Sequence, residues 1–189
     1  MIKIGILGDI GSGKSYVANN FGYPVFNADY EVSKLYKKNK EIFRKLNKKL
    51  PKYIYSFPID KNQISEAILK NNINLDIIIK IVHKEIRKKM KLFLNKNKNK
   101  KVVILDIPLL LENKLYRNKD ILVFVEAKKK NIEERIKKRP NFNQKLINKF
   151  KKIQFKPNYK KRKSHFIIKN NFKKKSVIIN IKQILEKIL

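Results

Sequence analysis

Three segments with different patterns follow one another at the start of the chain. Residues 1–7 are mainly apolar and rich in isoleucine, which predicts a buried strand. The segment Gly8–Ser15 comes next and fits G-x-x-x-x-G-K-[ST], and a helix is predicted from about Lys14 to Phe21. A strand, a glycine-containing loop and a helix in this order are the context in which the pattern forms a phosphate-binding P-loop. The start of the chain therefore indicates an α/β fold with an anion site at the end of its first strand.

This loop predicts that the chain binds the phosphates of a nucleotide. Gly11 and Gly13 have no Cβ that would keep the backbone away from a phosphate. Successive backbone N–H groups and the N-terminus of the helix form a concave anion site. Lys14 is expected to reach the β- and γ-phosphates, and Ser15 to ligate Mg²⁺. The alternative is an ordinary glycine-containing turn between a strand and a helix.

Short apolar runs predict four further strands, at residues 24–27, 102–106, 121–125 and 166–168. Helices are predicted at residues 131–139 and 143–155, and Ser176 is expected to cap a last helix that runs to Leu189. Strands that alternate with helices predict a mostly parallel, five-stranded sheet in a three-layer α/β core. Residues 30–100 differ, because their apolar residues recur at helical spacing, and they are predicted to form a helical insertion. The Lys/Asn run at 95–101 is predicted to be a solvated loop.

The composition excludes several classes of protein. The chain has 189 residues, no cysteine and 42% hydrophobic residues, so it can bury a core but has no disulfide or thiolate metal site. Its longest apolar stretch, Val102–Leu111, is broken by Asp106 and Pro108 and is too short to cross a membrane. The N-terminus resembles a strand and not a signal peptide. A soluble protein in a reducing compartment, the cytoplasm, is therefore expected, with no membrane partner.

The formal net charge of +33 has two interpretations. Only 6 of the 48 basic residues are arginine, and Lys, Asn and Ile, which have A/T-rich codons, make up about half of the chain. One interpretation is compositional drift with solvated helix faces; the other is a selected surface that binds polyanions. Specific recognition of nucleic acids and phosphates favours arginine, so no specific nucleic-acid partner is expected.

Two aspartates follow predicted strands, where ligands bind in open α/β sheets. Asp29 comes just after the second strand and is a candidate to take a proton from a substrate hydroxyl. It would otherwise cap a helix that begins at about Tyr30. Asp106 ends the run Val-Val-Ile-Leu-Asp, which resembles a Walker B strand, and is a candidate to hold Mg²⁺ or to bond to Ser15. Otherwise it is a turn residue at the end of a strand.

Two pairs of residues stand four apart on predicted helices. Arg135 and Arg139 suit the stabilisation of charge on a transferring phosphoryl group. The alternative is a solvated helix face. His83 and Arg87 are spaced to bind a second, phosphorylated substrate, although a lone histidine on a helix is more often structural.

Together these residues resemble the dephospho-CoA kinase family of P-loop kinases. The resemblance covers the whole chain, with the motifs in family order. Its most specific parts are Asn27-Ala28-Asp29, which is similar to D-A-D, and Asp106–Glu112, which is similar to D-x-P-L-L-F-E. His83–Arg87 looks like H-P-x-I-R, the segment 134–154 is similar to the family's lid, and Ser164–Asn170 resembles A-D-x-V-I-x-N.

The resemblance implies a function and a role for each matching residue. It implies transfer of the γ-phosphoryl group of ATP, with Mg²⁺, to the 3′-hydroxyl of dephospho-CoA, which is the last step of coenzyme A biosynthesis. Asp29 would be the base, Lys14 and Arg139 would stabilise charge, and Ser15 and Asp106 would hold the metal. The implied ATP contacts are Gly11, Ser12, Gly13, Lys14, Ser15, Tyr16, Arg135 and Asn170. The implied contacts with dephospho-CoA are Asp29, His83, Arg87, Asp106 and Glu112.

The resemblance also implies an organisation. The chain would be one P-loop kinase domain over residues 1–189, with a nucleotide-binding core at 1–29 and 101–189. Residues 30–100 would bind CoA and residues 139–163 would form a lid, in a monomer or weak oligomer. The departures from the family pattern are Asp9 for Gly, Asn27 for Asp, Lys84 for Pro, Leu111 for Phe, Pro140 for Asp and His165 for Asp.

Two other functions remain open from the residues alone. One is a P-loop kinase that acts on a nucleotide or a small metabolite, against which the long helical insertion with His83 and Arg87 argues. The other is a nucleic-acid-binding P-loop protein, for which the scattered Tyr and Phe residues give no stacking platform.

Overall fold

The protein consists of two compact units. A computed structural model describes residues 1–140 and 142–189. The first unit comprises Met1–Asn27, Asn97–Asn143 and Phe150–Leu189, and the second comprises Ala28–Lys96 and Gln144–Lys149. No helix among the described residues has the length and the apolar character that crossing a membrane requires.

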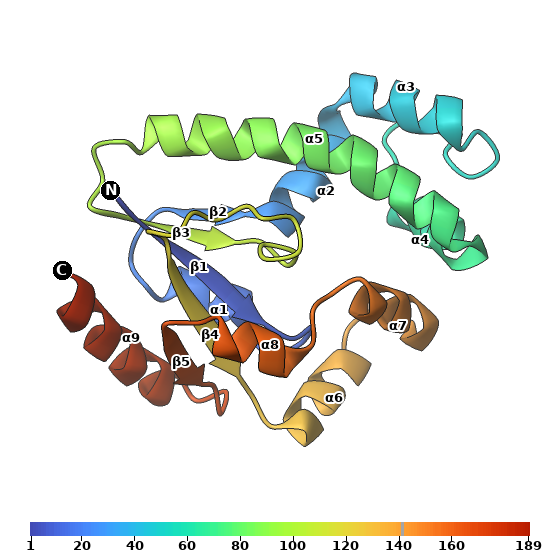
Figure 1. Cartoon of the computed structure of the whole chain (residues 1–189). Helices are drawn as coiled ribbons and strands as arrows, with labels where there is room; N and C mark the ends of the chain where they lie inside the picture. The colour runs from blue at the N-terminus through green and yellow to red at the C-terminus, as the bar shows by residue number, and fades with distance from the viewer. Residues whose placement is uncertain (141) are drawn as a thin grey trace. The chain divides into compact units, whose positions relative to one another are not determined.

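The first unit contains the predicted five-stranded parallel sheet. Its strands have the order β2-β3-β1-β4-β5 and every neighbouring pair is parallel. Their bounds are β1 Ile2–Gly8, β2 Val25–Asn27, β3 Val102–Asp106, β4 Ile121–Glu126 and β5 Phe166–Lys169 (Figure 1). Because β1 is central, the chain leaves it toward β2 on one side and returns through β4 and β5 on the other. Ligands bind at such a switch point, beyond the carboxyl ends of the strands.

Alternate residues of the strands face different layers. Helices α1, Lys14–Asn19, and α9, Lys174–Ile188, cover one face of the sheet. The core on this side comprises Ile4, Ile6, Val17, Ala18, Phe21, Val102, Ile104, Val123, Val125, Ile168, Val177, Ile181 and Ile184. The turn at 107–115 and helix α8, Pro157–Arg162, pack on the other face, where a Cβ on Gly5 would lie 2.4 Å from Cδ2 of Leu110. The sheet is therefore the middle of three layers.

The C-terminal helices differ in detail from the predictions. Helix α6 spans Lys129–Lys137 and α7 spans Gln144–Lys152, so both end before the predicted positions, and α8 was not predicted. Helix α9 begins at Lys174, so the prediction that Ser176 caps it is wrong. Ser176 lies inside the first turn of α9, and its carbonyl accepts a hydrogen bond from the side chain of Asn180. A serine is only one possible start signal, and here the helix begins without it.

The second unit is helical. Its helices are α2 Ala28–Lys38, α3 Lys40–Lys49, α4 Lys61–Lys70 and α5 Asn72–Lys96. Asn39 caps α3 by accepting a hydrogen bond from the N–H of Ile42 at 3.0 Å, and Asp60 caps α4 in the same way. Residues 144–149 of α7 belong to this unit, where Nζ of Lys149 donates to Oδ1 of Asn72 at 2.9 Å. Helix α5 runs to Lys96, so the first part of the predicted Lys/Asn loop is helical.

Replacement of a central core residue should test the importance of the sheet packing. Ile6 of β1 is fully buried, so Ile6→Ala should lower the free energy of unfolding by about 2–5 kcal/mol, through lost burial and a residual cavity. Ile179 on α9 is 46% exposed, and Ile179→Ala should change it by less than about 0.5 kcal/mol. Urea unfolding followed by circular dichroism measures both. Equal losses in the two variants would contradict the assigned core.

Candidate active site

The P-loop joins the carboxyl end of β1 to helix α1. Gly11 has a φ of 88° and Gly13 a φ of 92°, a region that side chains disfavour. A Cβ on Gly11 would lie 2.8 Å from Cγ1 of Ile136, and one on Gly13 would lie 2.3 Å from Nδ2 of Asn170. The two glycines are therefore required by packing inside the protein, in addition to the approach of a phosphate that the sequence predicted.

Lys14 lies over the loop that precedes it. Its Nζ donates hydrogen bonds to the carbonyl oxygens of Gly8 at 3.1 Å and Asp9 at 2.8 Å. Ser15 and Tyr16 follow in the first turn of α1 and are exposed. The Lys14 ammonium therefore stands at the loop, bonded to carbonyl oxygens that a phosphate can replace.

Asn170 supports the loop from the end of β5. It is 3% exposed, and its Nδ2 donates to the carbonyl oxygen of Ser12 at 2.9 Å. Its Oδ1 accepts a hydrogen bond from the N–H of Phe172 at 2.9 Å. These contacts place Asn170 beside the P-loop, and both are contacts with other parts of the protein. The predicted contact of Asn170 with adenine stays a prediction.

The sequence gives no indication that Phe172 belongs to the site. Its φ of 64° is unusual for an aromatic residue, which normally avoids this left-handed region. Its ring lies 4.4 Å from Cζ of Arg135, a cation–π contact. The contact brings Arg135, predicted to bind ATP, next to the segment that holds the P-loop. No sequence signal marks a positive φ at a phenylalanine, so Phe172 could not have been found that way.

Arg139 does not share a helix face with Arg135, and that prediction is wrong. Helix α6 ends at Lys137, so Arg139 lies in the following turn, where its N–H donates to the carbonyl oxygen of Ile136 at 3.1 Å. Lys138 caps the helix with helical dihedral angles, and Arg139 stands just before Pro140, which disfavours helical geometry in the residue that precedes it. Both arginine side chains are exposed. Position 141 of the predicted lid is outside the described residues.

The Asp106 carboxylate is hydrogen-bonded to Asn27, one of the residues that depart from the family pattern. Asn27 and Asp106 are partners in the register of β2 and β3, at the carboxyl ends of both strands. Nδ2 of Asn27 donates to Oδ2 of Asp106 at 2.7 Å, and Asp106 is 3% exposed. An aspartate at position 27 would place a second carboxylate there. The asparagine therefore supplies a neutral donor that orients the buried carboxylate.

Glu112 contacts the segment that leads into α8. Its Oε1 accepts a hydrogen bond from the N–H of Phe155 at 2.8 Å and lies 3.0 Å from Nζ of Lys160. Its Oε2 is buried and has no hydrogen-bond partner within residues 1–140 and 142–189. Sequence reasoning predicted a substrate contact for Glu112 and did not identify Lys160, whose position in a basic run gives no sign of burial.

The remaining predicted substrate residues belong to the second unit. Helix α2 begins at Ala28, so Asp29 lies in its first turn and does not cap a helix that begins at Tyr30. His83 is half-buried and Arg87 exposed, one turn apart on α5. The catalytic role of Asp29 and the binding roles of His83 and Arg87 stay predictions.

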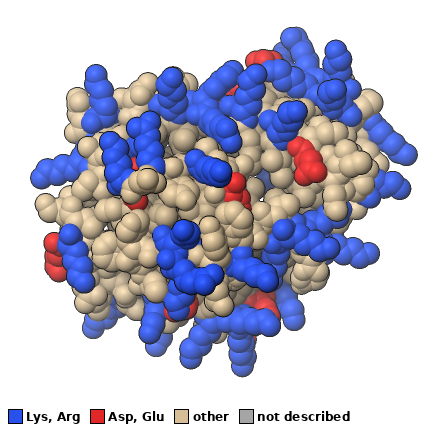
Figure 2. Space-filling model, viewed as in Figure 1, with Lys and Arg blue, Asp and Glu red and all other residues tan. Residues whose placement is uncertain are grey.

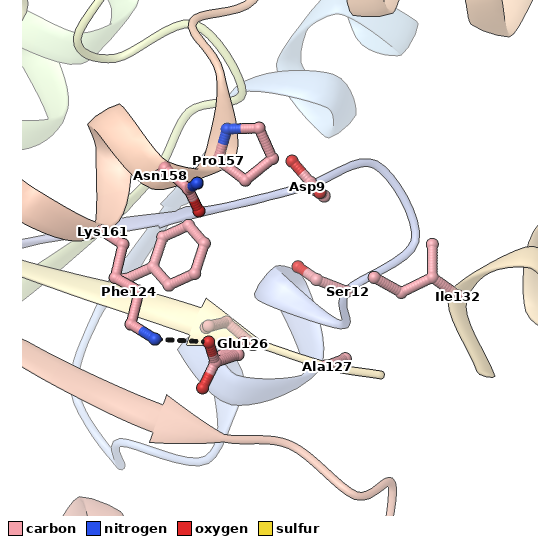
Figure 3. A pocket seen from close by; sticks show the side chains of 10 residues that line it. Asp9, Ser12, Phe124, Glu126, Ala127, Ile132, Pro157, Asn158 and Lys161 are labelled. Atoms are coloured by element: carbon pink, nitrogen blue, oxygen red, sulfur yellow. Dashed lines mark hydrogen bonds and ion pairs between the residues drawn. The ribbon is translucent and has the colours of Figure 1, made fainter. Parts of the chain in front are cut away.

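A small pocket adjoins the P-loop within the first unit. Asp9 and Ser12 line it from the loop, the end of β4 from another side, and α6 and α8 from the remaining sides (Figure 3). Its lining includes an ion pair in which Nζ of Lys161 lies 2.7 Å from Oε1 of Glu126. Oγ of Ser12 is buried here and has no hydrogen-bond partner in the described part of the chain. The P-loop thus has α8 as its neighbour on one side.

The positive charge is not confined to this site. Figure 2 shows Lys and Arg side chains across the whole face in view, with few Asp or Glu between them. Such a field raises the encounter rate with any polyanion and does not by itself select one. Selection must therefore come from the contacts described above.

Known proteins resemble this chain over nearly its whole length. The family model described as dephospho-CoA kinase matches residues 2–176. A dephospho-CoA kinase from Wolbachia pipientis wMel is 34% identical over 188 residues, which cover 97% of this chain and 96% of that protein. Two solved structures share the fold. A protein from Thermus thermophilus has a TM-score of 0.77 at 24% identity, with 100% and 98% of the two chains covered. A dephospho-CoA kinase from Campylobacter jejuni has a TM-score of 0.63 at 20% identity, with 98% and 96% covered.

The Asn170 amide offers a direct test of how the P-loop is supported. Asn170→Asp replaces the donor to Ser12 with a carboxylate that faces a carbonyl oxygen, so the loop should shift. The dissociation constant for a fluorescent ADP analogue should rise by about tenfold or more, the equivalent of one lost buried hydrogen bond. Asn171→Asp is the control, because Oδ1 of Asn171 only accepts, from the N–H of Lys173 at 3.0 Å, and aspartate keeps that acceptor. Equal affinities in the two variants would contradict the support.

Proposed function

Because the chain belongs to the dephospho-CoA kinase family, we propose that it transfers the γ-phosphoryl group of ATP to the 3′-hydroxyl of dephospho-CoA. The products are coenzyme A and ADP, and the reaction is the final step of coenzyme A biosynthesis. The observation that carries this proposal is the family match over residues 2–176. The P-loop, with the Lys14 ammonium over it, supports it independently as a phosphate site.

Asp106 at the end of β3 and Ser15 at the start of α1 have oxygen ligands that suit a bound Mg²⁺. Asp106 provides a buried carboxylate and Ser15 an exposed hydroxyl in the first turn of α1. Within residues 1–140 and 142–189 there is no group of three or more His, Cys, Asp or Glu side chains that could hold a metal alone. This suits Mg²⁺ in a kinase, which takes one or two protein ligands and completes its shell with water and phosphate oxygens. Bound Mg²⁺ would neutralise charge on the β- and γ-phosphates.

The protein's own part in the reaction is to position groups and to handle one proton. The ribose 3′-oxygen forms a bond to the γ-phosphorus while the bond to the bridging oxygen of ADP breaks. We assign the Asp29 carboxylate as the acceptor of the hydroxyl proton. Lys14 exchanges its two carbonyl acceptors for phosphate oxygens, and Arg139 adds positive charge where negative charge develops.

The parts of the chain receive separate tasks in this proposal. The core at 1–29 and 101–189 binds ATP, and the helical segment at 30–100 binds dephospho-CoA through His83 and Arg87. Residues 139–163 close over the phosphates as a lid and contribute Arg139. The exposed side chains of Arg139 and Arg162 support the role of residues 139–163 as a lid, because a group that contacts a ligand must be accessible to it.

The base can be tested with a nearly isosteric change. Asp29→Asn should lower kcat for 3′-phosphorylation by about 10²–10⁴-fold, because the amide cannot accept the proton. Affinity for ATP should change little. Asp76→Asn, an exposed residue on α5 of the same unit, is the matched control and should keep full turnover.

The assay offers the protein dephospho-CoA, AMP, CMP and shikimate in parallel, with ADP release as the measurement. Preferred turnover of AMP, CMP or shikimate would contradict the proposed substrate. Near-normal turnover of dephospho-CoA by Asp29→Asn would contradict the assignment of the base.

Variants of Asn27 test how the hydrogen bond to Asp106 and a bound Mg²⁺ each contribute to stability. Asn27→Asp should lower the free energy of unfolding by about 1–3 kcal/mol in metal-free buffer, because two carboxylates then meet. Asn27→Ala loses the bond without adding charge and should lose less. Added Mg²⁺ should stabilise both variants, because each keeps Asp106 and Ser15, and it should stabilise Asn27→Asp more, because the metal also offsets the repulsion between the two carboxylates. If Mg²⁺ shifts the thermal unfolding of neither variant, Asp106 does not hold the metal.

A further inference from the structure

Lys160 is buried in a chain whose other lysines are half-buried or exposed. Its side chain is 1% exposed, and no other lysine of the described residues is buried to this degree. Burying an ammonium group without a partner is strongly unfavourable, because the group loses its hydration. The position of Lys160 therefore depends on the groups around it.

Two oxygen atoms compensate the buried charge. Nζ of Lys160 lies 3.0 Å from Oε1 of Glu112 and donates to Oε1 of Gln154, also at 3.0 Å. The Glu112 side chain is itself only 10% exposed. Its Oε1 also accepts the N–H of Phe155 at 2.8 Å, so one carboxylate oxygen joins Lys160 to the segment before α8.

This pair connects two parts of the first unit that are far apart in the sequence. Glu112 lies in the turn after β3, where Leu110 and Leu111 are buried. Lys160 lies on α8. The next residue, Lys161, faces Glu126 at the end of β4 in a partly exposed pair, which contributes less because water screens it. Loss of one partner should therefore matter more in the buried pair, because it leaves the other charge buried without compensation.

Helix α8 in turn forms a wall of the pocket beside the P-loop. Pro157, Asn158 and Lys161 line it together with Asp9 and Ser12 (Figure 3). A shift of α8 would therefore change the surroundings of the loop. It would also move the C-terminal part of the proposed lid, since α8 falls within residues 139–163.

We infer that Glu112 and Lys160 are a pair of positioning residues, which fix α8 beside the P-loop and anchor the root of the lid. Glu112 acts on the reaction through Lys160 and does not contact dephospho-CoA, unlike the role that the family resemblance implies for it. The inference rests on the proposed function for its kinetic readout. Its structural part concerns α8 alone.

The test compares Lys160→Met, Glu112→Gln and the double variant that carries both changes. Each single change leaves the charge of the other partner buried without its counter-charge, so kcat for dephospho-CoA should fall on the order of 10- to 100-fold, as expected for a displaced active-site element. The KM for dephospho-CoA should stay within about twofold of the parent, since no contact with that substrate is lost. The double variant should be no worse than the worse single variant, because coupled residues are not additive.

Hydrogen exchange gives a second measurement that does not depend on turnover. The amides of residues 153–163 should exchange faster in both single variants, while those of β1 stay protected. Lys129→Met is the matched control, because Lys129 is 91% exposed and faces Glu133 at 3.9 Å. It should change neither kinetics nor exchange. Gln154→Ala keeps the ion pair and removes one contact of Lys160, so it provides a milder variant if the others do not fold.

Three results would overturn the inference. In the first, Glu112→Gln raises the KM for dephospho-CoA while Lys160→Met leaves the kinetics unchanged, which makes Glu112 a substrate contact. In the second, the variants lower only the melting temperature and keep the parental kcat and KM. In the third, exchange at 153–163 is unaltered. If the parent protein does not phosphorylate dephospho-CoA, the proposed function fails instead, and hydrogen exchange alone decides the role of the pair.

Discussion

The hydrogen bond from Asn170 to Ser12 is the contact that ties the P-loop to the edge strand β5 of the sheet. The loop leaves the central strand with Gly8, Gly11 and Gly13 at positive φ, and the Asn170 side chain donates a hydrogen bond to the carbonyl oxygen of Ser12 from the end of β5. The same amide occupies the space that a Cβ on Gly13 would need. Helix α6 packs on Gly11 through Ile136. The loop is therefore shaped by two elements that are distant from it in sequence, the end of β5 and helix α6, before any phosphate binds. Such preorganisation reduces the cost of ordering the site when a ligand arrives.

Charge is used at three levels of burial in this protein. Lys14 is half-buried and stands over the P-loop, where its partners are carbonyl oxygens that a ligand can replace. Lys160 is fully buried and has fixed partners, so it can only be structural or positioning. The exposed lysines contribute a general field that salt screens within about 10 Å. The same residue type thus serves different ends, and only its surroundings distinguish them.

Much of the fold could be predicted from the sequence, because buried parallel strands are continuous apolar runs and the P-loop fixes the position of the first strand and helix. The ends of helices were less predictable. Ser176 was expected to cap α9, which begins at Lys174. Arg139 was expected on α6, which ends at Lys137. Local signals of this kind are weak compared with packing, and Pro140 shows only that the helix cannot continue far.

The candidate site could be predicted only in the part where its residues lie close together in one sequence motif. Asn27 and Asp106 are 79 residues apart, and their hydrogen bond follows from the register of two strands, which no local pattern reveals. The same reason hides Lys160, one lysine within a basic run. Arginine is scarce here, and its planar guanidinium stacks on a ring in a way that lysine does not reproduce. Arg135 illustrates this through its contact with Phe172. In a chain with this composition, an abundant residue such as lysine therefore becomes informative only when its burial is known.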